Sequence, residues 1–346
     1  MKTNNFLKGL DELRAIAALA VVFHHIELLK GSNIAGSWDN IPSLINSNVY
    51  LSHFTMAIGK YAVLFFFVLS GFLITHLMLQ EYKKYNTFDF KSFYMRRVLR
   101  IWPLYYIIMG LTFFVIPFIG NHWGLLQEHP NSWYKLLINT DFNSLRTWFT
   151  SWSFLSNHTL YDGIVLVGGS QTWSVSIEEQ FYLFWPILLL VVFKKRPILY
   201  LALTIISIIL LNRYCKGNIP SSMLFFEFLF LGGIGALFYH SPQFNKIRKN
   251  IDKKLFYFVN LFIIIILSFI PIFSSYSQYV IISIFFLFFI ILTVNNSYCF
   301  RSRLFSQIGK ISYGVYMYHT FVMFLMFPFV KYIKINILQK TGGGNG

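Results

Sequence analysis

The stretch "LRAIAALAVVFHHIELL", residues 13–29, decides how the rest of the chain is interpreted. It is close to the roughly 20 apolar residues that a helix needs to cross a bilayer, yet it contains Arg14, His24 and His25. An ionisable side chain inside a membrane is costly and usually faces a cavity or a partner. An α-helix turns about 100° per residue, so Arg14 and His25 share one face about 16 Å apart, whereas His24 points elsewhere.

Similar apolar stretches recur along the whole chain. Its 346 residues are 56% hydrophobic and only 12% charged, against about 25% charged in a soluble domain. We therefore predict an all-α fold, a polytopic transmembrane helix bundle of about nine to ten spans. The spans that we place are 12–29, 55–79, 98–119, 174–193, 197–212, 221–240, 255–273, 278–294 and 311–333.

The net charge of +16 is distributed in short clusters between the apolar runs. That distribution orients a membrane protein, so we expect no nucleic-acid partner. Most of the Lys and Arg residues fall on the side that includes the N-terminus, which predicts a cytoplasmic N-terminus. Cys215 and Cys299 lie at the ends of different predicted spans on opposite sides, so we expect no disulfide, and no metal-ligand spacing is present.

The two ends of the chain need separate interpretation. Lys2 and Lys8 precede an apolar run, as in a signal peptide, but Arg14 interrupts the run and no convincing cleavage site follows. We expect a retained first span and one integral membrane domain over residues 1–334. Residues 335–346 end in "TGGGNG" and are interpreted as a flexible tail or an expression remnant.

The first helix allows two interpretations of its polar residues. Histidine is the natural general base near neutral pH, so His25 is a candidate catalytic residue. Alternatively, His25 packs and bonds to a neighbouring helix while Arg14 reaches lipid headgroups. This helix alone leaves the choice open.

The stretch "FKSFYMRRVLRIWPLYY", residues 90–106, begins the third span with three arginines. Arg97 and Arg100 are neighbours on one helical face, with Arg96 adjacent. A guanidinium matches phosphate oxygens bidentately, so a polyanion is a plausible partner. The alternative is a membrane anchor that binds lipid phosphate.

The stretch "GGSQTWSVSIEEQFYLFWP", residues 168–186, places Thr172, Ser174 and Ser176 before Glu178 and Glu179. A helix N-terminal cap explains one glutamate. Two acids at the start of an apolar helix predict that one of them pairs with a base or a bound group. The span count places this site near the outer face.

The last span begins "ISYGVYMYHTFV", residues 311–322, with Tyr313, Tyr316 and His319 three residues apart. Tyrosines are ordinary at a membrane interface, so this segment alone is weak evidence. The loop 120–172, rich in Trp, Asn and Ser, is interpreted either as a lid over a polar cavity or as a segment that packs on the membrane surface.

Five segments, in this order, resemble the acyltransferase-3 family of integral membrane O-acyltransferases: "GLDELRAIAALAVVFHH", "LFFFVLSGFLIT", "RRVLRIWPLYY", "TWSVSIEEQFYLFWP" and "ISYGVYMYH". The resemblance spans about residues 7–330. The family often has glycine where Glu12 and Ala15 stand. Its core usually has ten spans with both ends cytoplasmic, so nine spans imply either a missing last helix or two spans that we merged.

The resemblance implies transfer of an acyl group, most often acetyl, from cytoplasmic acyl-coenzyme A to a hydroxyl of a cell-surface glycan or its lipid-linked precursor. The protein would then lie in the plasma (bacterial inner) membrane and need no metal. The residues of the implied site fall into three groups: catalytic His25, Glu178 and Glu179; coenzyme A-binding Arg14, Arg96, Arg97 and Arg100; and substrate-binding Trp173, Ser174, Tyr313 and His319.

The arginines and His25 are then expected to mark the two ends of a single tunnel. His25 acts either as a general base, which we favour, or as an acyl carrier. The competing interpretation is a transporter or flippase of a polar lipid-linked solute, which also needs buried charges. That class predicts an internal repeat, which the sequence does not show. The acceptor, the acyl chain length and the oligomeric state are not readable from the sequence.

Overall fold

The computed structural model describes residues 9–31, 44, 48–128, 132–139, 142, 144–193, 225–250, 252–270, 272, 275–295 and 302–342. The regular secondary structure of this part of the chain is helical throughout, which confirms the all-α prediction. Each expected span coincides with a helix, except that 197–212 lies outside the described residues. Cys215 and Cys299 also lie outside them.

Three long helices begin the described part of the chain. They are α1 (Leu10–Gly31), α2 (Val49–Tyr85) and α3 (Phe90–Gly110), which continues through a turn of π-helix (Leu111–Val115) into α4 (Ile116–His122). Four short helices and one long helix follow: α5 (Gly124–Glu128), α6 (Ser132–Asn139), α7 (Leu145–Trp152), α8 (Ser156–Tyr161) and α9 (Thr172–Phe193).

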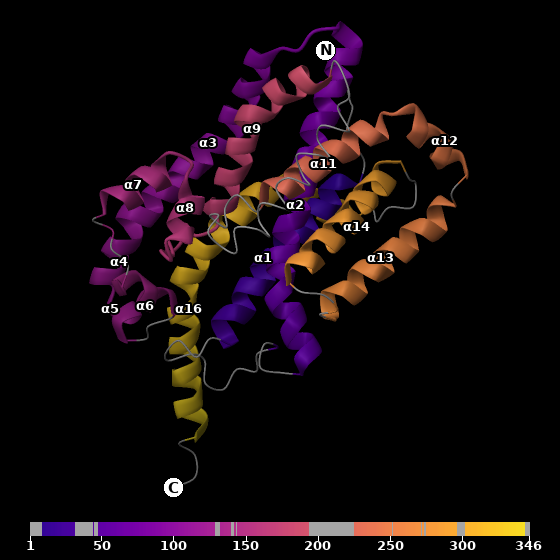
Figure 1. Cartoon of the computed structure of the whole chain (residues 1–346). Helices are drawn as coiled ribbons and strands as arrows, with labels where there is room; N and C mark the ends of the chain where they lie inside the picture. The colour runs from indigo at the N-terminus through magenta and orange to yellow at the C-terminus, as the bar shows by residue number, and fades with distance from the viewer. Residues whose placement is uncertain are drawn as a thin grey trace.

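The second half adds six helices to the bundle: α11 (Phe226–Tyr239), α12 (Pro242–Asn250), α13 (Lys253–Phe269), α14 (Ser275–Asn295), α15 (Arg303–Lys310) and α16 (Ser312–Gly342). Figure 1 shows α1 and α2 in the middle, α4 to α8 on one side and α11 to α14 on the other. α2 packs against α1, α9, α11, α13 and α14, so it is the central helix.

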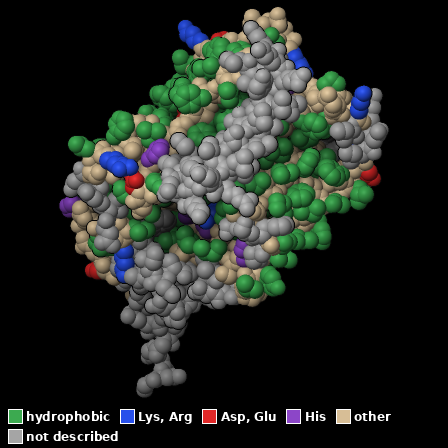
Figure 2. All heavy atoms as spheres, viewed as in Figure 1, with side chains coloured by type: hydrophobic (Ala, Val, Ile, Leu, Met, Phe, Trp, Pro, Cys, Tyr) green, Lys and Arg blue, Asp and Glu red, His purple; other side chains and the backbone are tan. Residues whose placement is uncertain are grey.

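Four helical segments of the described chain are long and apolar enough to cross a membrane: Val49–Tyr85, Phe90–His122, Tyr276–Val294 and Ser312–Ile333. A span needs about 20 such residues. Hydrophobic side chains also cover much of the described surface on the face shown in Figure 2. These features indicate a membrane protein, whereas the number of spans and the cytoplasmic N-terminus remain predictions.

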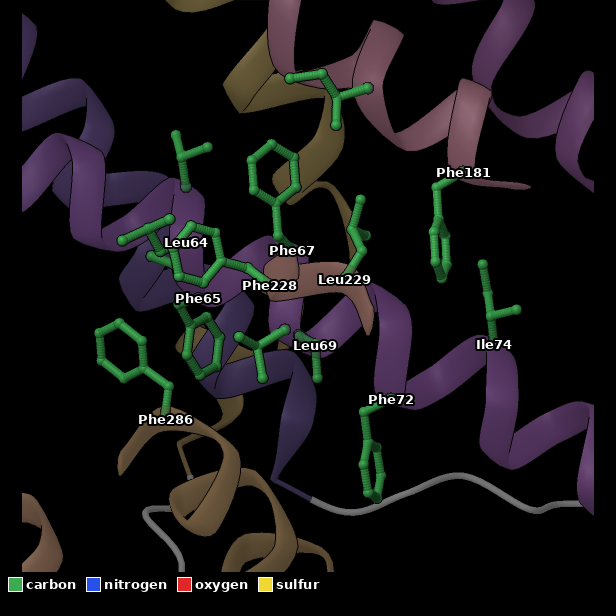
Figure 3. Close-up of a cluster of buried hydrophobic side chains, with 14 of the residues drawn as sticks. Leu64, Phe65, Phe67, Leu69, Phe72, Ile74, Phe181, Phe228, Leu229 and Phe286 are labelled. Atoms are coloured by element: carbon green, nitrogen blue, oxygen red, sulfur yellow. The ribbon is translucent and has the colours of Figure 1, made fainter. Parts of the chain in front are cut away.

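The core forms where other helices converge on α2. Figure 3 shows Phe67 and Phe72 of α2 among Phe228 of α11, Phe286 of α14 and Phe181 of α9. The first four of these side chains are at most 8% exposed. Because these rings fill the space between the helices, they hold α2 and its neighbours in fixed relative positions.

Glycines let α2 and α11 approach closely. A Cβ atom on Gly71 would lie 1.9 Å from the Leu229 carbonyl oxygen, and one on Gly232 would lie 2.1 Å from the Val68 carbonyl oxygen. Small residues at helix contacts allow such backbone approach in membrane proteins. The glycine of "LFFFVLSGFLIT" therefore serves packing.

A short turn joins α2 to α3 and sets where the arginine-rich helix begins. Asn86 ends α2 in a left-handed conformation, with φ of 55°. Asp89 caps α3 by accepting a 3.0 Å hydrogen bond from the Ser92 amide. The bonds from Ser92 lower the pKa of the Asp89 carboxyl. The cap thus fixes the first turns of α3, which hold Arg96, Arg97 and Arg100.

Candidate functional site

Three arginines from two helices line one cavity of about 100 Å³, here called the arginine cavity. α1 contributes Arg14, and α3 contributes Arg97 and Arg100. α9 supplies Ser174 and Glu178 to the opposite part of the wall. α16 supplies Tyr313 and Tyr316. Phe66, Phe67 and Ser70 of α2 also line it, so the five motif-bearing helices meet at a single cavity.

The guanidinium groups of this cavity have few protein partners. Arg97 lies over the rings of Tyr182 and Phe93, 4.7 and 5.4 Å from their centroids. Among the described residues, neither Arg97 nor Arg100 forms an ion pair within 4.0 Å, and Arg14 has only a 3.4 Å contact with Asp11. The cavity is thus positively charged and suited to an anion.

Arg96 lies apart from this cavity. It lines a different cavity of about 280 Å³, here called the third cavity, with Glu81, Phe88, Arg97 and Arg100. Arg97 and Arg100 therefore lie in the walls of both cavities. A ligand in this third cavity can contact all three arginines of α3, and it must extend into the arginine cavity to reach Arg14 as well.

Glu178 lies in the arginine cavity with its carboxylate held on both oxygens. Ser70 donates to Oε1 at 3.2 Å, and Tyr182 donates to Oε2 at 2.6 Å. The sequence places Glu178 near the outer face and the arginines near the inner face, but the structure brings Glu178 together with Arg97 and Arg100. Glu178 lies about 9 Å from the start of α9, and Arg100 lies about 15 Å from the start of α3. Because each group lies well inside its helix, the two meet although their helices begin at opposite ends of the bundle.

Glu179 lies on another face of α9. The Trp102 indole donates to its Oε2 at 3.0 Å, and within the described chain its Oε1 is buried without a hydrogen-bond partner. Glu179 lines neither the arginine cavity nor the cavity that holds His25. The structure therefore separates two glutamates that the sequence leaves equivalent.

His25 lies in the wall of a second cavity, of about 380 Å³, here called the histidine cavity. Its wall includes His24, Lys60, Trp173 and Asn157, from α1, α2, α9 and α8. Figure 2 shows Lys or Arg and His side chains inside a hollow on the visible face. His25 thus faces a cavity, as expected for an ionisable residue in a span.

The tautomer of His25 follows from its hydrogen bond. Its Nδ1 lies 2.9 Å from the Val21 carbonyl oxygen, which can only accept. Nδ1 therefore carries the proton of the neutral ring, and Nε2 is the free acceptor. His24 is tied in the same way to the Thr55 carbonyl oxygen at 2.6 Å. An imidazole with a fixed Nδ1 and a free Nε2 is arranged as a general base.

His319 of α16 stands beside His25. Their ring centroids are 4.9 Å apart at 61°. His319 Nδ1 donates to the Tyr316 carbonyl oxygen at 2.5 Å, and its Nε2 is buried with no partner among the described residues. His319 is not part of the cavity wall, so it contacts the His25 ring without lining the cavity.

Two side chains separate the arginine and histidine cavities. Val63 of α2 and Tyr316 of α16 line both of them. The Tyr316 hydroxyl is bonded to Ser174 at 2.7 Å and donates to the Gln171 carbonyl oxygen at 3.3 Å. The sequence predicts one tunnel, and the structure instead shows adjacent cavities divided by these two side chains.

The segment between α4 and α9 contributes to the histidine cavity. Asn157 and Leu160 of α8, with Val165, Ser170 and Gln171 from the turns before α9, lie in its wall. The segment thus covers this cavity, as the lid interpretation expects. Its helix α7 also leaves large apolar side chains exposed, among them Leu145 and Phe149, and packing of that helix on the membrane surface stays a prediction.

The sequence motifs and this geometry can be compared with known proteins. A profile of the acyltransferase-3 family, described as "Acyltransferase domain", matches residues 7–342. The chain belongs to this family. No solved structure matches the chain significantly.

The similar acyltransferases are bacterial. The peptidoglycan O-acetyltransferase OatA of Listeria monocytogenes is 27% identical over 370 residues, which cover 97% of this chain and 52% of that protein. The O-acetyltransferase OatA of Staphylococcus aureus is 28% identical over 372 residues, 98% of this chain and 53% of that protein. The chain therefore spans about half the length of these curated relatives.

Several residues of this acyltransferase site were missed in the sequence. Ser70 is an ordinary serine in an apolar run, and Tyr182 is one aromatic residue among many. Tyr316 looks like an interface tyrosine, and His24 was placed away from the site. Only Lys60 carries a recognisable signal, because it is a charge inside an apolar run.

Proposed function

We propose that the chain is an integral membrane O-acetyltransferase of the bacterial plasma membrane. It takes acetyl from acyl-coenzyme A at the cytoplasmic side and transfers it to a hydroxyl of a cell-envelope glycan or a lipid-linked precursor. The observation that carries the proposal is the adjacency of a cationic cavity and a cavity with a free imidazole nitrogen, which share Val63 and Tyr316.

The arginine cavity fits the anionic part of the donor. Coenzyme A carries several phosphates on one end and a thin arm on the other. Arg97 and Arg100 lack ion-pair partners among the described residues, and their guanidinium groups suit phosphate oxygens. Arg96 extends the same charge into the third cavity. These arginines therefore hold the phosphates in our account, with Arg14 nearer the arm.

Glu178 has a role at the donor end in this account. Ser70 and Tyr182 fix its carboxylate at the wall of the arginine cavity. A carboxylate in that position can accept hydrogen bonds from the amide groups of the donor arm. Glu179 supports the site from behind through Trp102.

His25 supplies the chemistry in the histidine cavity. Its free Nε2 takes the proton from the acceptor hydroxyl as the oxygen attacks the thioester carbonyl carbon. The carbon–sulfur bond breaks, and the leaving thiolate takes the proton from the His25 imidazolium, which returns the ring to its neutral form. Holding both reactants in adjacent cavities supplies proximity, which lowers the barrier of a bimolecular step. Trp173 in the cavity wall offers a flat surface for a sugar ring.

Relatives point to a first acceptor to test. One of them is named a peptidoglycan O-acetyltransferase, so we propose peptidoglycan or its precursor as the acceptor. The test uses the purified chain in lipid nanodiscs with radiolabelled acetyl-coenzyme A and soluble peptidoglycan fragments. We expect saturable donor binding and labelled glycan. A chain that ignores acetyl-coenzyme A but moves a lipid-linked solute across vesicles would be a transporter, and the proposal would be wrong.

A further inference from the structure

Lys60 is a charged residue on the central helix of the bundle. It lies on α2, whose best 18-residue window has a mean hydropathy of 2.3. It is about 16 Å along the helix from Val49. The side chain is exposed and lies in the wall of the histidine cavity. A lysine at such a position in a span is costly unless it serves a partner or a function.

The charge of Lys60 has no partner in the part of the chain that the structure describes. No hydrogen bond or ion pair joins its Nζ to another described residue, whereas Lys30 is paired with Glu27 at 2.6 Å. The described residues in the wall of the histidine cavity include no Asp or Glu. The cavity therefore offers one ammonium group and no competing carboxylate to whatever enters it.

Lys60 lies in the same cavity wall as the two imidazoles of α1. The preceding residue, Gly59, packs directly against the His24 ring, because a Cβ atom there would lie 2.4 Å from His24 Cδ2. The ring centroid of His24 is 5.1 Å from that of His25. Lys60, His24 and His25 line the same cavity. One ligand in this cavity can therefore contact both Lys60 and His25.

The rest of the wall suits a sugar. Trp173, Phe225 and Tyr279 provide aromatic rings, and Asn157 and Ser170 provide polar groups. Aromatic faces with a few polar groups are typical of a small-molecule site that fixes orientation. We propose that Lys60 binds an anionic group of the acceptor, a carboxylate or a phosphate near the reacting hydroxyl. The histidine cavity then selects acidic glycans over neutral ones, which deepens the function proposed above and rests on it.

The test compares two soluble acceptors that differ in charge. One is a neutral oligosaccharide of N-acetylglucosamine. The other has the same length and carries free lactyl carboxylates on alternate sugars. A third acceptor is the same neutral oligosaccharide carrying phosphate esters. It shows whether Lys60 binds a carboxylate or a phosphate. The variants are Lys60→Met, Lys60→Arg and, as the matched control on α6, Lys135→Met.

We expect the wild-type chain to prefer a charged acceptor. Lys60→Met should lower the ratio of kcat/KM for charged against neutral acceptor at least about tenfold, because it removes a charge-assisted hydrogen bond. Lys60→Arg should restore most of the ratio, and Lys135→Met should leave it unchanged. An unchanged ratio in Lys60→Met would overturn the proposal. A change confined to the KM for acetyl-coenzyme A would also overturn it. The same holds if the ratio falls only when the content of anionic lipid in the nanodiscs is changed.

Binding of the same acceptors, measured by calorimetry without donor, separates this proposal from the proposed function. Absence of acetyl transfer by the wild-type chain would contradict the function. The calorimetric binding measurement would still test the role of Lys60. Tighter wild-type binding of the charged acceptor, lost in Lys60→Met and in Lys60→Gln, supports it, whereas equal binding of charged and neutral acceptors overturns it. Using two neutral variants guards against a folding defect in one of them.

Discussion

The rings of His25 and His319 are in contact, with centroids 4.9 Å apart. Each imidazole donates a hydrogen bond from Nδ1 to a main-chain carbonyl oxygen. The bonds to Val21 and Tyr316 fix both tautomers, so both Nε2 atoms are acceptors. His25 faces the histidine cavity and His319 lies behind it. In our proposal His25 is the base and His319 is the residue that positions it.

Replacement of His25 should separate donor binding from transfer. We expect His25→Ala to lower kcat by about 10²–10⁴-fold, the usual contribution of a general base, while acetyl-coenzyme A still binds the arginines. The matched control is His122→Ala. His122 makes the same kind of bond to the Phe118 carbonyl oxygen but is exposed at the end of α4. Steady-state transfer and donor binding should be measured on both variants.

His319 should matter less than His25. Because it touches the base and not the cavity, His319→Ala should reduce kcat by less than His25→Ala and leave the KM for acetyl-coenzyme A unchanged. The pH profile of kcat should shift in His319→Ala but keep its shape. Equal losses in His25→Ala and His319→Ala would contradict the division of roles between the two rings.

The arginines should control donor affinity. Arg97→Ala and Arg100→Ala should each raise the Kd for acetyl-coenzyme A about tenfold or more, since each removes a charged hydrogen-bond donor worth about 1.5–3 kcal/mol. Arg96→Ala should cost less, because Arg96 is exposed and outside the arginine cavity. Arg146→Gln, which breaks only the exposed pair with Asp162, is the control. Unaltered binding in the double variant of Arg97 and Arg100 would refute the phosphate assignment.

Variants of Tyr182 can separate the effects of two contacts on donor binding. Its ring lies against Arg97, and its hydroxyl bonds to Glu178. Tyr182→Phe keeps the ring under Arg97 and removes the hydroxyl that contacts Glu178 and Ser70. Tyr182→Leu removes both. A cation–π contact is worth about 0.5–2 kcal/mol, so we expect donor binding to weaken in Tyr182→Leu and to stay near wild type in Tyr182→Phe. Tyr94→Phe, which loses a bond to the Leu183 carbonyl oxygen, controls for the loss of a hydroxyl.

The contact between α2 and α11 predicts a stability effect at Gly71. An alanine there places its Cβ 1.9 Å from the Leu229 carbonyl oxygen, so the helices must separate. Overpacking of this kind costs about 1–3 kcal/mol, and the melting temperature should fall. Gly314→Ala is the matched control on α16, where a Cβ meets nothing within 4 Å. Equal melting temperatures for the two variants would contradict the packing argument.

The sequence was sufficient to predict where the long helices lie, because apolar runs and their charged flanks are features of local composition. It also placed Arg14 and His25 on one face of α1, since helical geometry alone fixes that relation. The structure bears this out in part: Arg14 lines the arginine cavity and His25 lines the adjacent histidine cavity. Helix α16 continues to Gly342, through part of the segment that we interpreted as a tail.

The partners across helices were not predictable from the sequence. Glu178 and Glu179 are adjacent in the chain, and only the packing of α9 against α2 and α3 gives one to Ser70 and the other to Trp102. Tyr316 was interpreted as an interface residue, and it is the position of α16 that makes it a wall between two cavities. Such relations depend on contacts between residues far apart in sequence, which periodicity does not encode.

The most direct measurement assays donor binding and acetyl transfer on the same nanodisc samples of three proteins: the wild-type chain, His25→Ala and the double variant Arg97→Ala, Arg100→Ala. The account predicts that the wild type binds radiolabelled acetyl-coenzyme A and acetylates the glycan, that His25→Ala binds the donor without transferring, and that the double variant loses binding. Transfer by His25→Ala at the wild-type rate would contradict the account.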